Sequence, residues 1–303
     1  MAIKVPTPKG FRDIAPEMAK RRRTAIDKIA STLEEMGFSP IETPTIEFAS
    51  TLTGKYGDEE KLIYKFQDRG GRDLALRYDL TVPLARYVAT YNPTLPFRRY
   101  QIGQVFRGEN PQRGRWREFT QFDFDSVGNP DLEEDAKVIA TTIKCTKNLG
   151  LTQTIILVND RANFADYPPA VARAIDKLNK IGEEGVKEEL KKSGMSEIEA
   201  SETIAKVKST KPTQNLEQIF NLLKENYSLT EGQDFRFDPT LARGLDYYTG
   251  AIFEAKPDSD PNSLSIGAGG RYDNLIGTFA KKSVPAVGFS FGLDRLLEIL
   301  DKK

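Results

Sequence analysis

The chain has 303 residues, and its 44 Lys and Arg residues balance 44 Asp and Glu residues, so its formal net charge is zero. Net charge therefore gives no support to nucleic-acid binding, although it is compatible with a local basic groove. Hydrophobic residues make up 39% of the chain and aromatic residues 10%. This composition excludes a disordered protein and predicts a sizeable core in one large domain or two unequal ones.

Two residue types with special chemistry are scarce or missing. Cys145 is the only cysteine, which rules out a disulfide framework within the chain and argues against a thiolate metal cluster. The chain has no histidine, so the usual general base and the commonest metal ligand are both missing. No apolar run is long enough to span a bilayer, and the first residues lack the apolar segment of a secretion signal. We therefore expect a cytoplasmic protein whose chemistry depends on carboxylates, arginines, hydroxyls and substrate groups.

The first third of the chain alternates between helical and extended patterns. Ile26, Ile29 and Leu33 recur at helical spacing between Pro16 and Gly37, which predicts a helix with these limits. Two glycines in QDRGGRD indicate a hairpin turn. The following elements are predicted as a hairpin over 63–79, a helix from about residue 80, a strand over 98–107, a helix over 132–149 and a buried strand over 155–159.

The stretch from 105 to 125, VFRGENPQRGRWREFTQFDFD, predicts two strands joined by a long loop. Side chains alternate between the faces of a strand, so the second strand has one apolar and one polar face. The polar face carries Arg117, Gln121, Asp123 and Asp125, and the other carries Thr120, Phe122 and Phe124. The loop adds Arg107, Glu109, Arg113 and Arg115. Cations near acids suit a zwitterionic or phosphorylated ligand, but most charge-rich hairpins are solvated surface, so this segment alone leaves both interpretations open.

The second half of the chain begins with a helical region and returns to strands. Residues 168–226 are predicted to be helical, with Ser196 and Glu199 in a capping box and without a catalytic constellation. Strands are predicted from residue 235 onward, including LSIGA at 264–268, and the last strand is expected to break into a helix at Gly292. Arg295 lies inside the apolar run of that helix, where a cation needs an anionic partner. A salt bridge and a bound phosphate both satisfy this need.

Arginines that adjoin glycines or strand ends offer a way to hold a nucleotide. The sequence contains neither a GxxxxGK[ST] loop nor a GxGxxG after a strand, which excludes the common nucleotide-binding folds. Guanidinium groups hold phosphate oxygens in a bidentate manner that lysine does not reproduce. We therefore predict an antiparallel sheet floor with arginines at its rim, namely Arg107, Arg115, Arg243 and Arg295.

Several motifs resemble one enzyme family. FRGENPQRGRWREFTQFDFD resembles the second signature motif of class II aminoacyl-tRNA synthetases and GFSFGLDRLLEIL resembles the third. The N-terminal helix with Pro44 is similar to the first motif, which builds a dimer interface in that class. LARGLDYYTGAIFE and AGGRYDNLIG resemble the two histidine-specific motifs of histidyl-tRNA synthetases, and LRYDLTVPLAR also has the form found in that family. The resemblance covers residues 7–300.

The resemblance implies an α+β fold: a class II synthetase core with a mainly antiparallel sheet flanked by helices. The core would comprise residues 1–165 and 233–303, and residues 166–232 would form a helical insertion domain. We expect the C-terminal anticodon-binding domain of the family to be absent. The implied reaction activates L-histidine with ATP, accompanied by Mg²⁺, to give histidyl-adenylate and pyrophosphate, and then transfers histidine to the acceptor end of tRNA(His). A homodimer without membrane contact, and without a metal site of its own, is also implied.

The resemblance also implies roles for individual residues. Arg107 and Arg243 would be catalytic at the α-phosphate, where Arg243 takes the place that a metal ion has in related enzymes. ATP would also be bound by Glu109 near the adenine amino group and by Arg115 and Arg295 at the outer phosphates. Gln112 would approach the extra 5′ nucleotide of the tRNA. Histidine would be bound by Asp79, Thr81, Gln121, Asp125, Tyr247, Tyr248 and Tyr272.

Two other functions remain open from the sequence. The regulatory subunit of ATP phosphoribosyltransferase resembles the same core, lacks the anticodon-binding domain and senses histidine without catalysis. The length of the chain favours this alternative, whereas Arg107, Glu109, Arg243 and Arg295 argue against it because a sensor does not need residues directed at ATP. The second alternative is an adenylating enzyme that acts on an acceptor other than tRNA.

Overall fold

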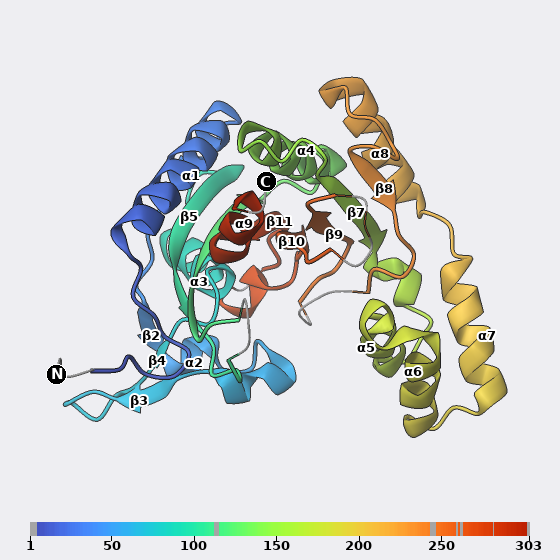
Figure 1. Cartoon of the computed structure of the whole chain (residues 1–303), viewed down its shortest axis with the longest axis horizontal. Helices are drawn as coiled ribbons and strands as arrows, with labels where there is room; N and C mark the ends of the chain where they lie inside the picture. The colour runs from blue at the N-terminus through green and yellow to red at the C-terminus, as the bar shows by residue number, and fades with distance from the viewer. Residues whose placement is uncertain are drawn as a thin grey trace.

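An eight-stranded sheet forms the centre of the computed structural model (Figure 1). The structure describes residues 5–301 except 112–114, 243–246, 259, 261–262 and 281. In spatial order the strands are β1 (Ser39–Pro40), β5 (Phe97–Phe106), β6 (Glu118–Val127), β11 (Ala286–Gly292), β10 (Gly267–Arg271), β9 (Ala251–Lys256), β7 (Ile155–Asp160) and β8 (Phe235–Phe237). Only the outermost pairs, β1 with β5 and β7 with β8, are parallel. The predicted, mainly antiparallel sheet is therefore confirmed.

Four helices pack against this sheet, namely α1 (Pro16–Glu35), α4 (Leu132–Asn148), α8 (Gln214–Tyr227) and α9 (Leu293–Leu300). Phe122 and Phe124 of β6 and Phe289 and Phe291 of β11 are buried in the core that these helices share with the sheet. Because side chains alternate along a strand, the polar residues of β6 must face away from these helices. The predicted division of β6 into an apolar and a polar face is confirmed.

A smaller layer closes one end of the polar face. It contains the three-stranded sheet β2 (Ile46–Phe48), β4 (Asp73–Leu76) and β3 (Lys65–Gln67), together with α2 (Ala49–Leu52), η1 (Gly57–Leu62), α3 (Thr81–Tyr91) and η3 (Ile276–Thr278). Its apolar cluster includes Tyr56, Tyr78 and Tyr272. This layer therefore brings residues from both ends of the sequence to the edge of the polar face.

The helical region does not pack as one unit. Helices α5 (Pro169–Ile175), α6 (Leu178–Lys192) and α7 (Glu197–Lys208) follow η2 (Arg161–Phe164), share their own apolar cluster and lie together beyond β7 (Figure 1). Helix α8 instead packs on α4, and its buried residues belong to the main core. Ser196 caps α7 in the predicted capping box with Glu199. No helix in the described ranges has the length and apolar character needed to cross a membrane.

The prediction for β10 was wrong. The sequence indicated a strand over 264–268 that stops at the following glycines, whereas β10 runs from Gly267 to Arg271. Both of its edges are paired, and an added Cβ at Gly269 would lie 2.6 Å from the ring of Phe253 and 2.9 Å from the backbone of Phe289. Glycine is therefore required inside this strand by the close approach of its neighbours and does not terminate it.

Candidate active site

A cavity of about 750 Å³ lies on the polar face of the sheet. Strand β6 contributes the polar side chains of Gln121, Asp123 and Asp125 to the floor of this cavity. The register places small residues of β11 directly beside them, with Gly288 opposite Asp125 and Ser290 opposite Asp123. The long polar side chains of β6 next to the small residues of β11 leave space for a ligand above the sheet.

Two glycines are essential to the shape of this cavity. An added Cβ at Gly288 would overlap the carboxylate of Asp125 and lie 2.9 Å from the carbonyl oxygen of Phe124. An added Cβ at Gly270 would lie 2.8 Å from the ring of Tyr248. At both positions the added Cβ would be closer to its neighbours than non-bonded atoms can approach. The positions of Asp125 and Tyr248 therefore depend on glycine at these sites.

Buried acids and tyrosines line one end of the cavity. Nη2 of Arg99 lies 2.7 Å from Oδ2 of Asp125, and the hydroxyl of Tyr272 donates to Oδ1 of the same carboxylate. Burial raises the pKa of Asp125, and the charge of Arg99 and the hydrogen bond from Tyr272 oppose this shift. The ring of Tyr247 lies 5.1 Å from that of Tyr248 and 5.8 Å from that of Tyr272, measured between centroids. This end therefore combines an aromatic wall with a hydrogen-bonding acid.

Asp79 is a second buried acid at this end. Its Oδ1 accepts hydrogen bonds from the hydroxyl of Tyr56 and the backbone N–H of Val82, each at 3.0 Å. Its Oδ2 is buried and has no hydrogen-bond partner among the described residues. Burial raises the pKa of this carboxyl group. An oxygen of this kind suits a ligand that supplies a cationic donor.

Asp123 is a third acid, and the sequence suggested no role for it. Burial, as the main cause, raises the pKa of Asp123 to about 7, with Arg99 acting in the opposite direction and Asp125 adding to the rise. Ser290 donates a hydrogen bond to Asp123 and accepts one of 3.0 Å from Nε2 of Gln121. The floor of the cavity is therefore a continuous polar row.

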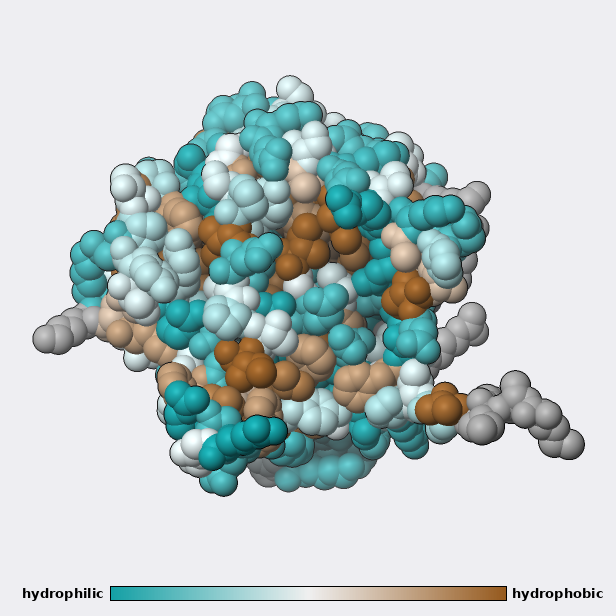
Figure 2. All heavy atoms as spheres, turned by 90° about the vertical axis from the view of Figure 1, so that its left-hand side faces the viewer, coloured by the Kyte–Doolittle hydropathy of each residue, from teal (hydrophilic) through white to brown (hydrophobic). Residues whose placement is uncertain are grey.

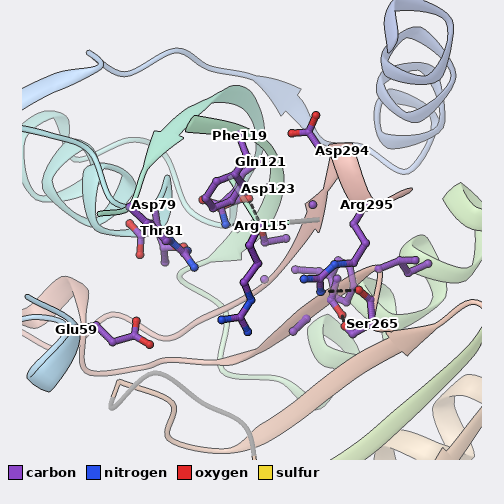
Figure 3. A pocket seen from close by; sticks show the side chains of 18 of the residues that line it. Glu59, Asp79, Thr81, Arg115, Phe119, Gln121, Asp123, Ser265, Asp294 and Arg295 are labelled. Atoms are coloured by element: carbon purple, nitrogen blue, oxygen red, sulfur yellow. Dashed lines mark hydrogen bonds between the residues drawn. The ribbon is translucent and has the colours of Figure 1, made fainter. Parts of the chain in front are cut away.

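Arginines line the end of the cavity opposite Asp79, and Arg107 also lies near Asp79, where its charge opposes the rise in the pKa of that carboxyl group. The guanidinium group of Arg107 lies 4.3 Å from the ring centroid of Tyr78, and its Nε donates a 3.2 Å hydrogen bond to the carbonyl of Tyr78. Nη1 of Arg295, from α9, donates a 2.9 Å hydrogen bond to the carbonyl of Ser265. Figure 3 shows Arg295 across the cavity from Asp79, with the side chain of Arg115 extending between them in this view. These cations create a positive region beside the acidic end.

The structure brings the predicted site residues together. All of those that it describes line this one cavity: Asp79, Thr81, Arg107, Glu109, Arg115, Gln121, Asp125, Tyr247, Tyr248, Tyr272 and Arg295. Arg115 and Glu109, which were predicted to contact different parts of ATP, form an ion pair with each other at 3.3 Å. Gln112 and Arg243 lie outside the described residues. The individual roles remain predictions.

Two contributors were missed by the sequence analysis. Arg99 was treated only as part of a strand, although it is completely buried beside Asp125. Asp294 lines the cavity beside Arg295, and its carboxylate binds Arg12, Arg22 and the backbone N–H of Thr120. Both are charged residues in largely apolar segments, where a charge requires a partner. The sequence does not show which residues the partners are, because they come from distant parts of the chain.

Comparisons with known proteins agree with this geometry. A family model described as histidyl-tRNA synthetase matches residues 10–166 and 165–296. The chain is 42% identical to the histidine–tRNA ligase of Aeropyrum pernix, over 96% of the chain and 73% of that protein. It is 41% identical to the histidine–tRNA ligase of Korarchaeum cryptofilum, over 97% of the chain and 74% of that protein.

Solved structures show the same fold. The histidyl-tRNA synthetase from Nostoc sp. PCC 7120 superposes with a TM-score of 0.82 at 30% identity, covering 99% of this chain and 76% of that one. A protein from Bacillus halodurans C, described as an ATP phosphoribosyltransferase regulatory subunit/histidyl-tRNA synthetase, superposes with a TM-score of 0.80 at 26% identity, covering 99% of this chain and 84% of that one. The sequence matches and the shared fold together show that this chain belongs to the histidyl-tRNA synthetase family.

Proposed function

We propose that the chain is a class II histidine–tRNA ligase core, which activates L-histidine with ATP and transfers it to tRNA(His). The observation that carries this proposal is a single cavity that holds buried acids and tyrosines together with Arg107, Arg115 and Arg295. Relatives with about 40% identity over nearly the whole chain are named histidine–tRNA ligases. A sensor that binds only histidine would have no use for Arg107 and Arg295 in the same cavity.

The acidic end would bind histidine. Oδ2 of Asp79 would accept a hydrogen bond from the α-amino group, with Thr81 and Gln121 beside it. The carboxylate of Asp125 would accept from one imidazole nitrogen, and the hydroxyl of Tyr248 would donate to the other. Such a site rejects apolar amino acids, because they would leave its buried polar groups without partners.

The arginine end would bind ATP and support the first step. An oxygen of the histidine carboxylate attacks the α-phosphorus, the bond from that phosphorus to the bridging oxygen breaks, and pyrophosphate leaves. Arg107 and Arg243 would stabilise charge at the α-phosphate, while Arg115 and Arg295 would hold the outer phosphates. The attacking carboxylate is already ionised, so the step requires no protein base and a chain without histidine can perform it.

Mg²⁺ would enter with ATP as part of the substrate. The described residues contain no group of three or more acidic or cysteine side chains that could hold a metal ion. The phosphates of ATP would supply its ligands. In the second step, a hydroxyl of the terminal tRNA ribose attacks the histidyl carbonyl carbon and AMP leaves, with Gln112 near the 5′ nucleotide.

The substitution Arg243→Ala tests the proposed chemistry. The unaltered chain is expected to catalyse histidine-dependent exchange of pyrophosphate into ATP. The variant is expected to lose this exchange while its affinity for histidine, measured by calorimetry, stays within about threefold, because Arg243 is assigned to the phosphate and not to histidine. An unchanged exchange rate would remove Arg243 from this role.

We further propose that the chain forms a cytoplasmic homodimer. The face that carries α1 and the three-stranded sheet has several apolar patches (Figure 2). Ile46 is 44% exposed there, Phe48 54% and Phe66 41%. Exposed apolar groups of this size indicate an interaction surface. The substitution Phe48→Glu is expected to convert a dimer into a monomer in light scattering, and a monomeric unaltered chain would contradict the proposal.

The division of the chain also remains a proposal. We retain residues 1–165 and 233–303 as the catalytic core and residues 166–232 as a helical insertion, supported by the separate apolar cluster of α5–α7. Helix α8, the last helix of this segment, packs on the main core and would join the insertion to it.

A further inference from the structure

Arg99 is a fully buried cation beside Asp125 at the acidic end of the cavity. It lies on β5, and the strand register places it opposite Asp125 of β6, with Gln101 opposite Asp123. The side chain is completely excluded from solvent. Taking a guanidinium group out of water is costly, so its presence must be compensated by nearby anions.

The hydrogen bonds of Arg99 are not those of an arginine retained for folding alone. Its Nη2 lies 2.7 Å from Asp125 and 3.5 Å from the carbonyl of Leu80. Its Nε and Nη1 have no hydrogen-bond partner among the described residues. A buried guanidinium group that only stabilised the fold would be expected to have its N–H groups satisfied. The charge of Arg99 is therefore directed mainly at the neighbouring carboxylates.

The contact leaves one oxygen of Asp125 able to accept a further hydrogen bond. Oδ2 is buried against Nη2 of Arg99, whereas Oδ1 accepts from Tyr272 and keeps a second lone pair for a ligand donor. Neutral imidazole carries one N–H donor and one acceptor nitrogen. An ionised Asp125 accepts most readily from that N–H and from Tyr272 together, because a protonated carboxyl group has fewer free lone pairs and must also donate its own proton.

Three buried acids compete for the ionised state at this end. Asp79, Asp123 and Asp125 are all buried, and burial is the main cause that raises the pKa of each. Arg99 opposes this shift for Asp123 and Asp125. Without this cation, two adjacent carboxylates would face each other in a dry site, and the pKa of Asp125 would rise further.

We propose that Arg99 is a positioning residue for amino-acid recognition, which holds Asp125 ionised and oriented so that its carboxylate accepts the imidazole N–H of histidine. The inference rests on the proposed function, because it concerns the histidine end of the same cavity. Arg99 touches neither substrate and acts only through Asp125.

The substitutions Arg99→Met and Arg99→Lys test this role in pyrophosphate exchange by the full chain. Arg99→Met is expected to raise the KM for histidine by about 10- to 100-fold, the range that corresponds to one charge-assisted hydrogen bond. The KM for ATP is expected to change by less than about threefold. Arg99→Lys keeps the charge and is expected to recover part of the affinity. Arg86→Met is the matched control, because Arg86 also pairs with a buried carboxylate, that of Glu47, and neither residue lines the cavity.

The pH dependence of the KM for histidine distinguishes a positioning role of Arg99 from a purely structural role. In Arg99→Met the groups facing Asp125 are Asp123, Tyr272 and the uncharged Gly288. Raising the pH would favour the ionised form of Asp125 and is expected to recover histidine affinity in this variant, whereas the unaltered chain would gain little. A KM that is high but independent of pH would overturn the proposal, as would a KM within threefold of the unaltered chain.

A second variant covers the case in which Arg99→Met does not fold. The double substitution Arg99→Met with Asp123→Asn removes one buried anion together with the buried cation, and Asp123→Asn alone is its reference. The double variant is expected to fold and to show a rise in the KM for histidine relative to that reference, smaller than the rise in Arg99→Met because one competing carboxylate is gone; equal KM values would overturn the proposal. If the unaltered chain itself neither binds histidine in calorimetry nor catalyses exchange, the proposed function fails, which is a different outcome from failure of the Arg99 variants alone.

Discussion

The substitution Gly288→Ala adds one methyl group next to the carboxylate of Asp125. The added Cβ would overlap that carboxylate and lie 2.9 Å from the carbonyl oxygen of Phe124. The main chain of β11 is paired on both sides, with β6 and β10, so the strand cannot move away easily. The side chain of Asp125 is the part that must rotate, and it would lose its contacts with Arg99 and Tyr272.

The expected size of the effect follows from those contacts. A hydrogen bond to a charged group contributes about 1.5–3 kcal/mol, which corresponds to a rise of about 10- to 150-fold in the dissociation constant of histidine. Extra volume in a packed core costs about 1–3 kcal/mol in the free energy of unfolding. The Gly288→Ala variant should therefore remain folded at 25 °C, because a domain has about 5–15 kcal/mol of stability.

Isothermal titration with histidine and urea unfolding measure these two effects separately. Gly292→Ala is the matched control on the same strand, because the nearest atom to its added Cβ is Cβ of Arg295 at 3.9 Å. The control is expected to bind histidine within about threefold of the unaltered chain. If Gly288→Ala binds histidine as tightly as Gly292→Ala, the assignment of Asp125 to the imidazole is refuted.

Three further predictions concern charges around the cavity. Asp135→Asn breaks the buried ion pair between Asp135, whose side chain is 0% exposed, and Arg271, whose side chain is 8% exposed. The substitution is expected to lower the free energy of unfolding by about 3–5 kcal/mol in urea melts, and a loss below about 1 kcal/mol would contradict this. Asp123 has a folded pKa near 7 against 3.8 unfolded, so it holds its proton longer when folded and the protein loses stability as pH rises from about 4 to 7. Asp123→Asn is therefore expected to gain stability relative to the unaltered chain over that range, and parallel pH profiles would contradict the shift. Asp294→Asn loosens the start of the helix that carries Arg295 and is expected to raise the KM for ATP about three- to tenfold in exchange assays, with an unchanged KM as the contrary result.

Local sequence patterns predicted the parts of the fold that depend on alternation and on chain-breaking residues. The two faces of β6 followed from Phe122 and Phe124 alternating with Asp123 and Asp125, and the structure confirms them. The change from β11 to α9 was expected at Gly292 and occurs there. These features are local, so neighbouring residues determine them.

Features that depend on distant neighbours were not predictable in this way. The glycines of β10 indicated the end of a strand, yet they lie inside it because Phe253 and Phe289 approach closely from the flanking strands. Arg99 and Asp125 are 26 positions apart, and only the register of β5 with β6 brings them together. The roles of individual site residues came from family resemblance, since residue type alone does not distinguish a ligand from a structural ion pair.

Exchange of labelled pyrophosphate into ATP, measured with each of the twenty amino acids in turn, tests the central claim most directly. The account predicts exchange with histidine that exceeds the rate with any other amino acid by at least about 10⁴-fold, the discrimination available to a site that hydrogen-bonds its substrate. Binding of histidine without any exchange would contradict the account and favour a histidine sensor.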